Sequence, residues 1–162
     1  MNLYSSGQSL FEGSERHQKL LAIMKEFNII QGGYLPYREA VEKYVNWLNK
    51  GIKPFVYKLF GEYSFRINEY EIITEQELET ICDVFRSYKP KKLFSGVKMY
   101  RREFATGELY KKEKVLFTKP GTILWEVTGL PFNTVLEMAR RASETCGVNI
   151  VCYDANGICV SQ

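Results

Sequence analysis

Apolar and polar positions follow the clearest pattern in residues 120–153, where they predict a strand, a helix and a second strand. Residues 123–127 form a β-branched and aromatic run, which is typical of a strand. A Gly-Leu-Pro turn ends this run, and apolar residues then recur at steps of three and four over about 131–146. Gly147 is suited to end the helix, and residues 148–153 resume an apolar strand. The predicted buried face of the helix consists of Val135, Met138, Ala139, Ala142 and Cys146.

Two further helices are predicted upstream. The first covers about residues 36–50, and Pro36 stands where a first-turn proline is tolerated. The second covers about 74–88, where Thr74 followed by Glu77 predicts a capping box at the helix start. The apolar stripes of the two helices are Ala40, Val41, Tyr44, Val45 and Leu48, and Leu78, Ile81, Cys82 and Phe85.

The two tryptophans have different expected environments. Trp47 falls off the stripe of its helix; a partly buried indole is the more common outcome, and the alternative is stacking on a base. Trp125 belongs to the strand at 123–127 and is expected to pack on the helix after Pro131.

Together these elements predict an α+β fold. We expect a mixed, mainly antiparallel sheet with two helices, about 36–50 and 131–146, packed on one side, plus an inserted helix at about 74–88. With 162 residues and 45% apolar content, the chain is large enough for one hydrophobic core. No apolar run approaches the roughly 20 residues that cross a bilayer, so no membrane partner is expected. Residues 1–19 resemble neither a secretory nor an import signal, so we expect synthesis where the protein works or an unusual signal.

Charge is unevenly distributed along the chain. The net charge is +3, but the segment 86–119 holds eleven Lys or Arg and three acidic residues, a net +8, and the remainder carries −5. Cations interleaved with Tyr and Phe are typical of a surface that binds a phosphate backbone and stacks unpaired bases. The alternative is a solvated hairpin with ordinary surface lysines.

The segment 62–83 has the opposite character, because it holds seven acidic residues and one arginine, Arg66. RNA phosphates would repel such a surface. It could dock another protein; the equally weighted alternative is a helix packed on the parent sheet.

Enzyme chemistry is not expected. His17 is the only histidine and has no nucleophile or carboxylate at a recognisable spacing. The four cysteines include no C-x-x-C pair, so we expect no metal and a set of reduced thiols. No phosphate-binding glycine loop is present, and we expect no cofactor.

The stretch P-G-T-I-L-W-E-V-T-G-L-P, the helix with E-M-A-R and the strand V-N-I-V-C-Y resemble the C-terminal half of the family of large-subunit ribosomal protein sixteen. Two upstream parts add to this resemblance: Gly33-Tyr34-Leu35 before the first helix with the strand 54–60 after it, and Val97-Lys98-Met99 as the counterpart of the family's Val-Arg-Met. The matching residues of the C-terminal stretch are Pro120, Gly121, Ile123, Leu124, Trp125, Glu126, Gly129, Pro131, Glu137, Arg140 and Ala142.

The resemblance implies a structural constituent of the large ribosomal subunit, which binds ribosomal RNA near the transfer-RNA cleft and performs no chemistry. Its implied partners are large-subunit ribosomal RNA, transfer RNA, and neighbouring ribosomal proteins through the acidic insertion. It also favours RNA contact by the basic segment, which occupies the place of the family's basic Gly-Lys loop. That loop is about five residues longer here and keeps only Gly107. Because glycines let a backbone approach RNA closely, a retained and a lost contact with transfer RNA are both alternatives for this loop. The residues expected to bind RNA are Arg38, Lys58, Lys91, Lys92, Lys98, Arg101, Arg102, Lys111, Lys112, Lys114, Lys119 and Arg140.

Several alternatives accompany this interpretation. Residues 1–26 are expected to be an N-terminal extension, and 27–162 a single ribosomal-protein-like domain with an acidic insertion at about 62–89. Because the family is usually far more basic, we expect a mitochondrial ribosome; the alternatives are a plastid or the bacterial cytoplasm. Arg140 could be solvated or ion-paired with Glu137 or Glu144 instead of binding RNA. The alternative function is a free-standing RNA-binding or translation-regulating module.

Overall fold

The computed structural model describes residues 15–26, 37–48, 50, 61–88, 105–109 and 113–161. These residues contain two three-stranded sheets, with strand orders β5-β1-β6 (first sheet) and β2-β4-β3 (second sheet), in which all strand pairs are antiparallel. The α+β class expected from the sequence is therefore confirmed. The elements are α1 (Glu15–Glu26), α2 (Tyr37–Leu48), β1 (Tyr63–Ile67), β2 (Glu71–Thr74), α3 (Glu75–Arg86), β3 (Ala105–Leu109), β4 (Glu113–Thr118), β5 (Ile123–Val127), α4 (Phe132–Cys146) and β6 (Ile150–Asp154).

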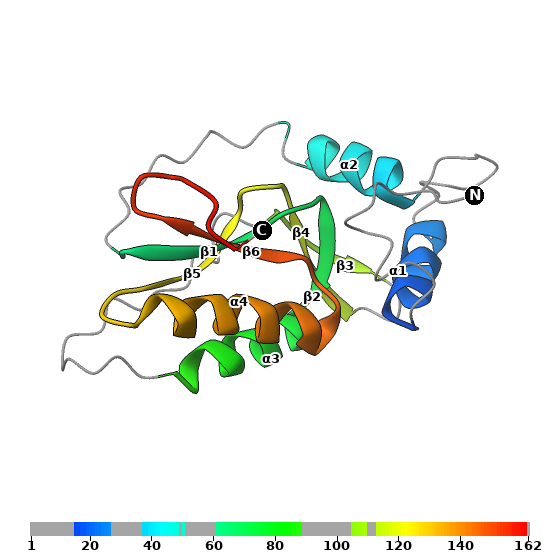
Figure 1. Ribbon diagram of the computed structural model, residues 1–162. Helices are drawn as coiled ribbons and strands as arrows, with labels where there is room; N and C mark the ends of the chain where they lie inside the picture. Colours follow the sequence, from blue (N-terminus) through cyan, green and yellow to red (C-terminus); the bar gives the residue numbers. More distant parts are fainter. Residues whose placement is uncertain are drawn as a thin grey trace, which may run out of the picture.

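The second sheet separates two hydrophobic clusters. Ile72 of β2 lies opposite Phe117 of β4, and both belong to the smaller cluster, which α1 and α2 complete. Ile73 lies opposite Leu116, and both belong to the larger cluster, which contains α3, α4 and the first sheet. Figure 1 shows α1 and α2 on one side of the second sheet and α3 with α4 on the other.

This arrangement differs in detail from the expected one. The strands form two sheets instead of one, and the helices α2 and α4 belong to different clusters instead of covering one side together. The physical reason is the continuous apolar run in β4, where Val115, Leu116 and Phe117 are all buried. Successive side chains of a strand point to opposite faces, so both faces of this strand need apolar cover.

The segment 61–88 builds the centre of the larger cluster. Its first strand, β1, is the middle strand of the first sheet, between β5 and β6. Its helix α3 buries the predicted stripe of Leu78, Ile81, Cys82 and Phe85. The Phe85 ring lies 4.7 Å from that of Phe65 and 5.6 Å from that of Trp125, measured between ring centroids. The acidic segment is therefore part of the core as well as of the surface, and Trp125 packs there against α3.

The unit β5–α4–β6 follows the predicted boundaries closely. All five residues of β5 are buried, and α4 buries Val135, Met138, Ala139 and Ala142 of the predicted stripe. Gly147 ends α4 with φ +70°, a left-handed conformation that glycine adopts at little cost.

Two carboxylates fix the chain that enters β1 next to β5. Glu126 is fully buried, and its Oε1 accepts a 2.7 Å hydrogen bond from the amide of Gly61. A Cβ on Gly61 would lie 2.9 Å from both Glu126 Cβ and Val127 O, so this position requires glycine. Glu62 Oε1 in turn accepts a 2.8 Å bond from the amide of Gly129, in the turn before α4.

The capping box predicted from Thr74 and Glu77 is present at the start of α3. The Glu77 amide donates to Thr74 Oγ1 at 3.1 Å, and the Thr74 amide donates to Glu77 Oε1 at 3.0 Å. We expect Thr74→Ala to lower the free energy of unfolding by about 1 kcal/mol, because the helix start loses one of these partners. Urea denaturation followed by circular dichroism measures this loss.

Thr80→Ala is the matched control for this prediction. Thr80 lies inside α3, where its hydroxyl donates to the Gln76 carbonyl and caps no helix end. Its replacement is expected to leave the free energy of unfolding within about 0.5 kcal/mol of the original value. Equal losses for the two variants would contradict a specific role for the cap.

Candidate nucleic-acid interface

The basic segment contains the β3–β4 hairpin, whose strands pair in register from Ala105 with Phe117 to Leu109 with Glu113. The hairpin is not a solvated projection, because β4 is the middle strand of the second sheet and is buried on both faces. Among the described side chains of residues 114–119, the four from Val115 to Thr118 are buried, and Lys114 and Lys119 on either side of them are exposed.

Lys114 and Lys119 are the only expected RNA-binding lysines among the described residues. Both are exposed, and neither forms an ion pair with another described side chain. The two residues are five positions apart, which in extended chain is about 17 Å, so they are too far apart to hold one phosphate. The hairpin therefore offers separate positive ends. The expected residues that lie outside the described part of the chain are Lys58, Lys91, Lys92, Lys98, Arg101, Arg102, Lys111 and Lys112.

Lys119 begins a tight turn between β4 and β5. The Thr122 amide donates to the Lys119 carbonyl at 3.1 Å, and Gly121 has φ +90°, as in a type II turn with proline at its second position. The turn is held to β1 by a 2.7 Å hydrogen bond from the Gly121 amide to the Ile67 carbonyl. Its backbone is therefore fixed, and Lys119 is presented at a defined place on the surface.

Arg140 and Arg38 lie on helices. Arg140 is exposed on α4, and its Nη1 donates to Glu144 Oε2 at 3.1 Å, which is the ion-paired alternative expected from the sequence. Arg38 lies in the first turn of α2, and its side chain is outside the described set.

The other described arginines are also engaged within the protein. Arg86 Nη1 lies 2.8 Å from Asp83 Oδ1 and 3.6 Å from Glu79 Oε2. The hydrogen bond with Asp83 is the main cause that raises the pKa of Arg86. Arg141 and Arg66 contact aromatic rings instead: Arg141 donates to Tyr88 Oη at 2.6 Å, and the Arg66 guanidinium lies 4.5 Å from the centroid of the Tyr153 ring. These three arginines therefore contact neighbouring side chains of the protein itself.

Carboxylates of the acidic segment are likewise used in the fold. Glu71 Oε2 accepts a 3.5 Å contact from the Asn149 amide, and both Glu71 and Glu69 are buried. Glu77 caps α3, and Glu62 bonds the turn at Gly129. The anionic surface is therefore smaller than the count of acidic residues indicates.

Trp47 is more exposed than the sequence led us to expect. We expected a partly buried indole, but the side chain of Trp47 is 66% exposed. The sequence contained an indication of this exposure, because Trp47 falls off the apolar stripe of α2. The stripe itself is confirmed, with Ala40, Val41 and Val45 fully buried.

All four cysteines are free thiols. Burial raises the pKa of the Cys152 thiol to about 12, with smaller contributions from Cys159 and Asp154, whereas Arg66 acts in the opposite direction. Within the described residues, no group of three His, Cys, Asp or Glu side chains is placed to hold a metal ion.

The described helices include none with the length and apolarity needed to span a membrane.

No protein-family model matches the chain, and no curated protein sequence matches it.

The raised pKa of Cys152 predicts a pH-dependent reactivity. In the folded protein we expect Cys152 to resist iodoacetamide from pH 7 to 10, because the thiolate forms only as the pH approaches 12. In urea it should react near the ordinary thiol pKa of about 8.5. The folded-state preference for the thiol stabilises the protein fully below that pH and is lost as the pH rises toward 12. Mass spectrometry of the alkylated peptides measures both rates.

Cys82 serves as a second buried thiol in the same experiment, and it should be protected in the folded state as well. Alkylation of Cys152 at pH 8 that is as fast in the folded protein as in urea would contradict its placement in the core.

Proposed function

We propose that this protein is a structural constituent of the large ribosomal subunit that binds ribosomal RNA. The observation that carries the proposal is the continuous stretch 120–153, whose residues resemble the family of large-subunit ribosomal protein sixteen. In the structure this stretch contains β5, α4 and β6 in the expected order. Two glycines that match the family, Gly121 and Gly129, both have positive φ, a backbone conformation that favours glycine.

The charge distribution supports RNA as the partner. A net charge of +8 in residues 86–119 contrasts with −5 in the rest of the chain. The described lysines of this segment are exposed and have no ion pair with another described side chain, whereas nearby arginines are paired. Exposed lysines can neutralise phosphates and release counterions, which makes such binding strongly dependent on salt.

We place the ribosome in a mitochondrion. The overall net charge of +3 is small for this class of ribosomal protein. A low net charge fits a ribosome in which more of each protein's surface meets other proteins. Transfer RNA is a further proposed partner, and neighbouring ribosomal proteins would meet the solvent-facing side of the acidic segment.

The proposal is tested by replacing four cations of the basic segment. We expect the quadruple variant of Arg101, Arg102, Lys111 and Lys112 to alanine to incorporate poorly into large subunits. The salt dependence of its affinity for ribosomal RNA should weaken, with the slope of log K against log salt smaller by roughly 3, since each lost contact with unpaired RNA removes about 0.7. Sedimentation of mitochondrial extracts and filter binding measure the two effects.

A matched pair of double variants controls for net charge. Lys111→Ala with Lys112→Ala should reduce incorporation, whereas Lys19→Ala with Lys25→Ala, which removes the same charge from α1, should not. Normal incorporation of the quadruple variant would overturn the assignment of this segment. Sedimentation of the native protein away from the large subunit would favour a free-standing RNA-binding module.

A further inference from the structure

Trp47 has the largest exposed fraction of the three large apolar side chains that are exposed in the described part of the chain. The values are 66% for Trp47, 59% for Ile158 and 49% for Phe132. A single exposed apolar residue is ordinary on a protein surface. Three features of the surroundings of Trp47 distinguish it from such a residue: its support, its flanking charges and its place on α2.

The indole is supported from the core. Its ring centroid lies 5.7 Å from that of Tyr44, and the Tyr44 centroid lies 4.9 Å from that of Phe117. Phe117 is buried in the smaller cluster, and Tyr44 is half-buried over it. Contacts on one side therefore restrain the Trp47 ring while most of its surface remains in solvent. A restrained aromatic surface loses little conformational entropy when a ligand stacks on it.

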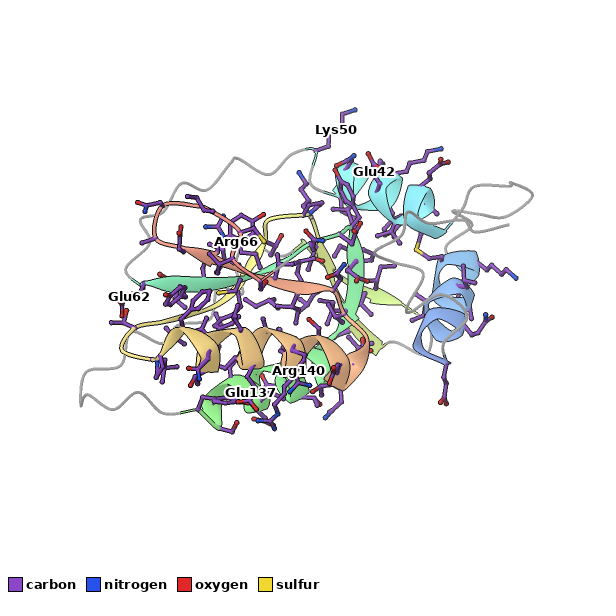
Figure 2. The ribbon with its side chains drawn as sticks, viewed as in Figure 1. Glu42, Lys50, Glu62, Arg66, Glu137 and Arg140 are labelled. Atoms are coloured by element: carbon purple, nitrogen blue, oxygen red, sulfur yellow. The ribbon has the colours of Figure 1, made fainter. Side chains whose placement is uncertain are left out.

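Two lysines flank the indole on the same side of α2. Lys43 precedes Trp47 by one helical turn, and Lys50 follows it just beyond the helix, where the Lys50 amide donates to the Trp47 carbonyl at 3.3 Å. Both side chains are exposed, and neither pairs with another described side chain. Figure 2 shows Lys50 extending away from the body of the protein at this end of α2.

The negative charges of the helix lie toward its other end. Glu39 and Glu42 are exposed in the first half of α2, whereas Lys43 lies in its second half before Trp47 and Lys50 follows the end of the helix. Exposed lysines therefore precede and follow the indole along the chain, and an anionic ligand with an aromatic part matches this pattern.

We propose that Trp47 is a stacking platform for an unpaired nucleotide, and that Lys43 and Lys50 hold the phosphates on either side of it. An indole stacks on the face of any base, so the site takes single-stranded nucleic acid with little sequence preference. A base inside a duplex is already stacked on its neighbours and cannot occupy the platform. The inference extends the proposed RNA binding and rests on it for the choice of RNA as the ligand.

Tryptophan fluorescence tests the stacking directly. The chain has two tryptophans, and the other one, Trp125, is only 4% exposed. We expect a single-stranded uridine octamer to quench the fluorescence of the full-length protein and of the Trp125→Phe variant. The Trp47→Phe variant should show no quenching, because its remaining tryptophan is buried.

Affinity measured by fluorescence anisotropy of a labelled octamer gives the size of the effect. Trp47→Ala should weaken binding about 10- to 100-fold, and Trp47→Phe should restore most of the loss, since phenylalanine also stacks. Lys43→Ala with Lys50→Ala should reduce the slope of log K against log salt by about 1.4. Phe132→Ala removes an exposed aromatic residue from α4, and this control should leave affinity unchanged.

The combined results separate this inference from the proposed function. If the quadruple variant of the basic segment binds weakly while Trp47→Ala binds normally and no quenching occurs, the platform is wrong and the RNA interface of the basic segment stands. If Trp47→Ala binds weakly while the quadruple variant binds normally, the platform stands and the basic segment is not the interface. If Trp47→Ala lowers incorporation into large subunits without any change in RNA affinity, the surface docks a protein, and the inference is overturned.

Folding of the variants is checked independently. Because Trp47 is mostly exposed, we expect the urea midpoint of Trp47→Ala to stay close to that of the unchanged protein. A variant that binds RNA weakly but keeps the urea midpoint of the unchanged protein has lost a contact with RNA and has kept its fold.

Discussion

The structure depends on the two-sided burial of the second sheet. Ile72 and Phe117 belong to the smaller cluster with α1 and α2, whereas Ile73 and Leu116 belong to the larger cluster with α3 and α4, so adjacent residues of β2 and β4 contribute to both clusters. Thr74 adds a covalent and hydrogen-bonded link, since it is the last residue of β2 and also the N-cap of α3. A change in the twist or register of β4 would alter both clusters at once, because side chains on the two faces share one backbone.

Periodicity predicted α2, α3 and α4 well, but it did not identify α1, which lies in the expected N-terminal extension, and it predicted the arrangement of the sheets poorly. Helices α3 and α4 are buried on one face and solvated on the other, so their apolar spacing identified both the elements and their stripes. Strands β2 and β4 are apolar at successive positions, and such runs do not tell which cluster lies on which face. The exposure of Trp47 was detectable from its place off the stripe of α2, but the general tendency of indoles to be buried outweighed that signal.

Counting charges along the sequence overestimated both the anionic and the cationic surface. Glu62, Glu71 and Glu77 accept hydrogen bonds from backbone amides of the fold. Arg86 and Arg140 are paired with carboxylates of their own helices. A net charge does not reveal such local pairs, although they determine which charged side chains remain available to bind a partner. The basic character of the segment 86–119 therefore depends more on lysine than its composition indicates.

The strand β4 joins the two proposed RNA contacts. Its ends carry the exposed Lys114 and Lys119, and its buried Phe117 supports Tyr44, on which Trp47 rests. A phosphate-binding lysine next to β4 and a base-stacking indole that packs on β4 through Tyr44 would hold a folded RNA at two fixed points, which specifies orientation better than either contact alone. The same connection means that a substitution in the core at Phe117 would disturb both contacts together. Only changes to exposed side chains can therefore distinguish the contribution of each contact to binding.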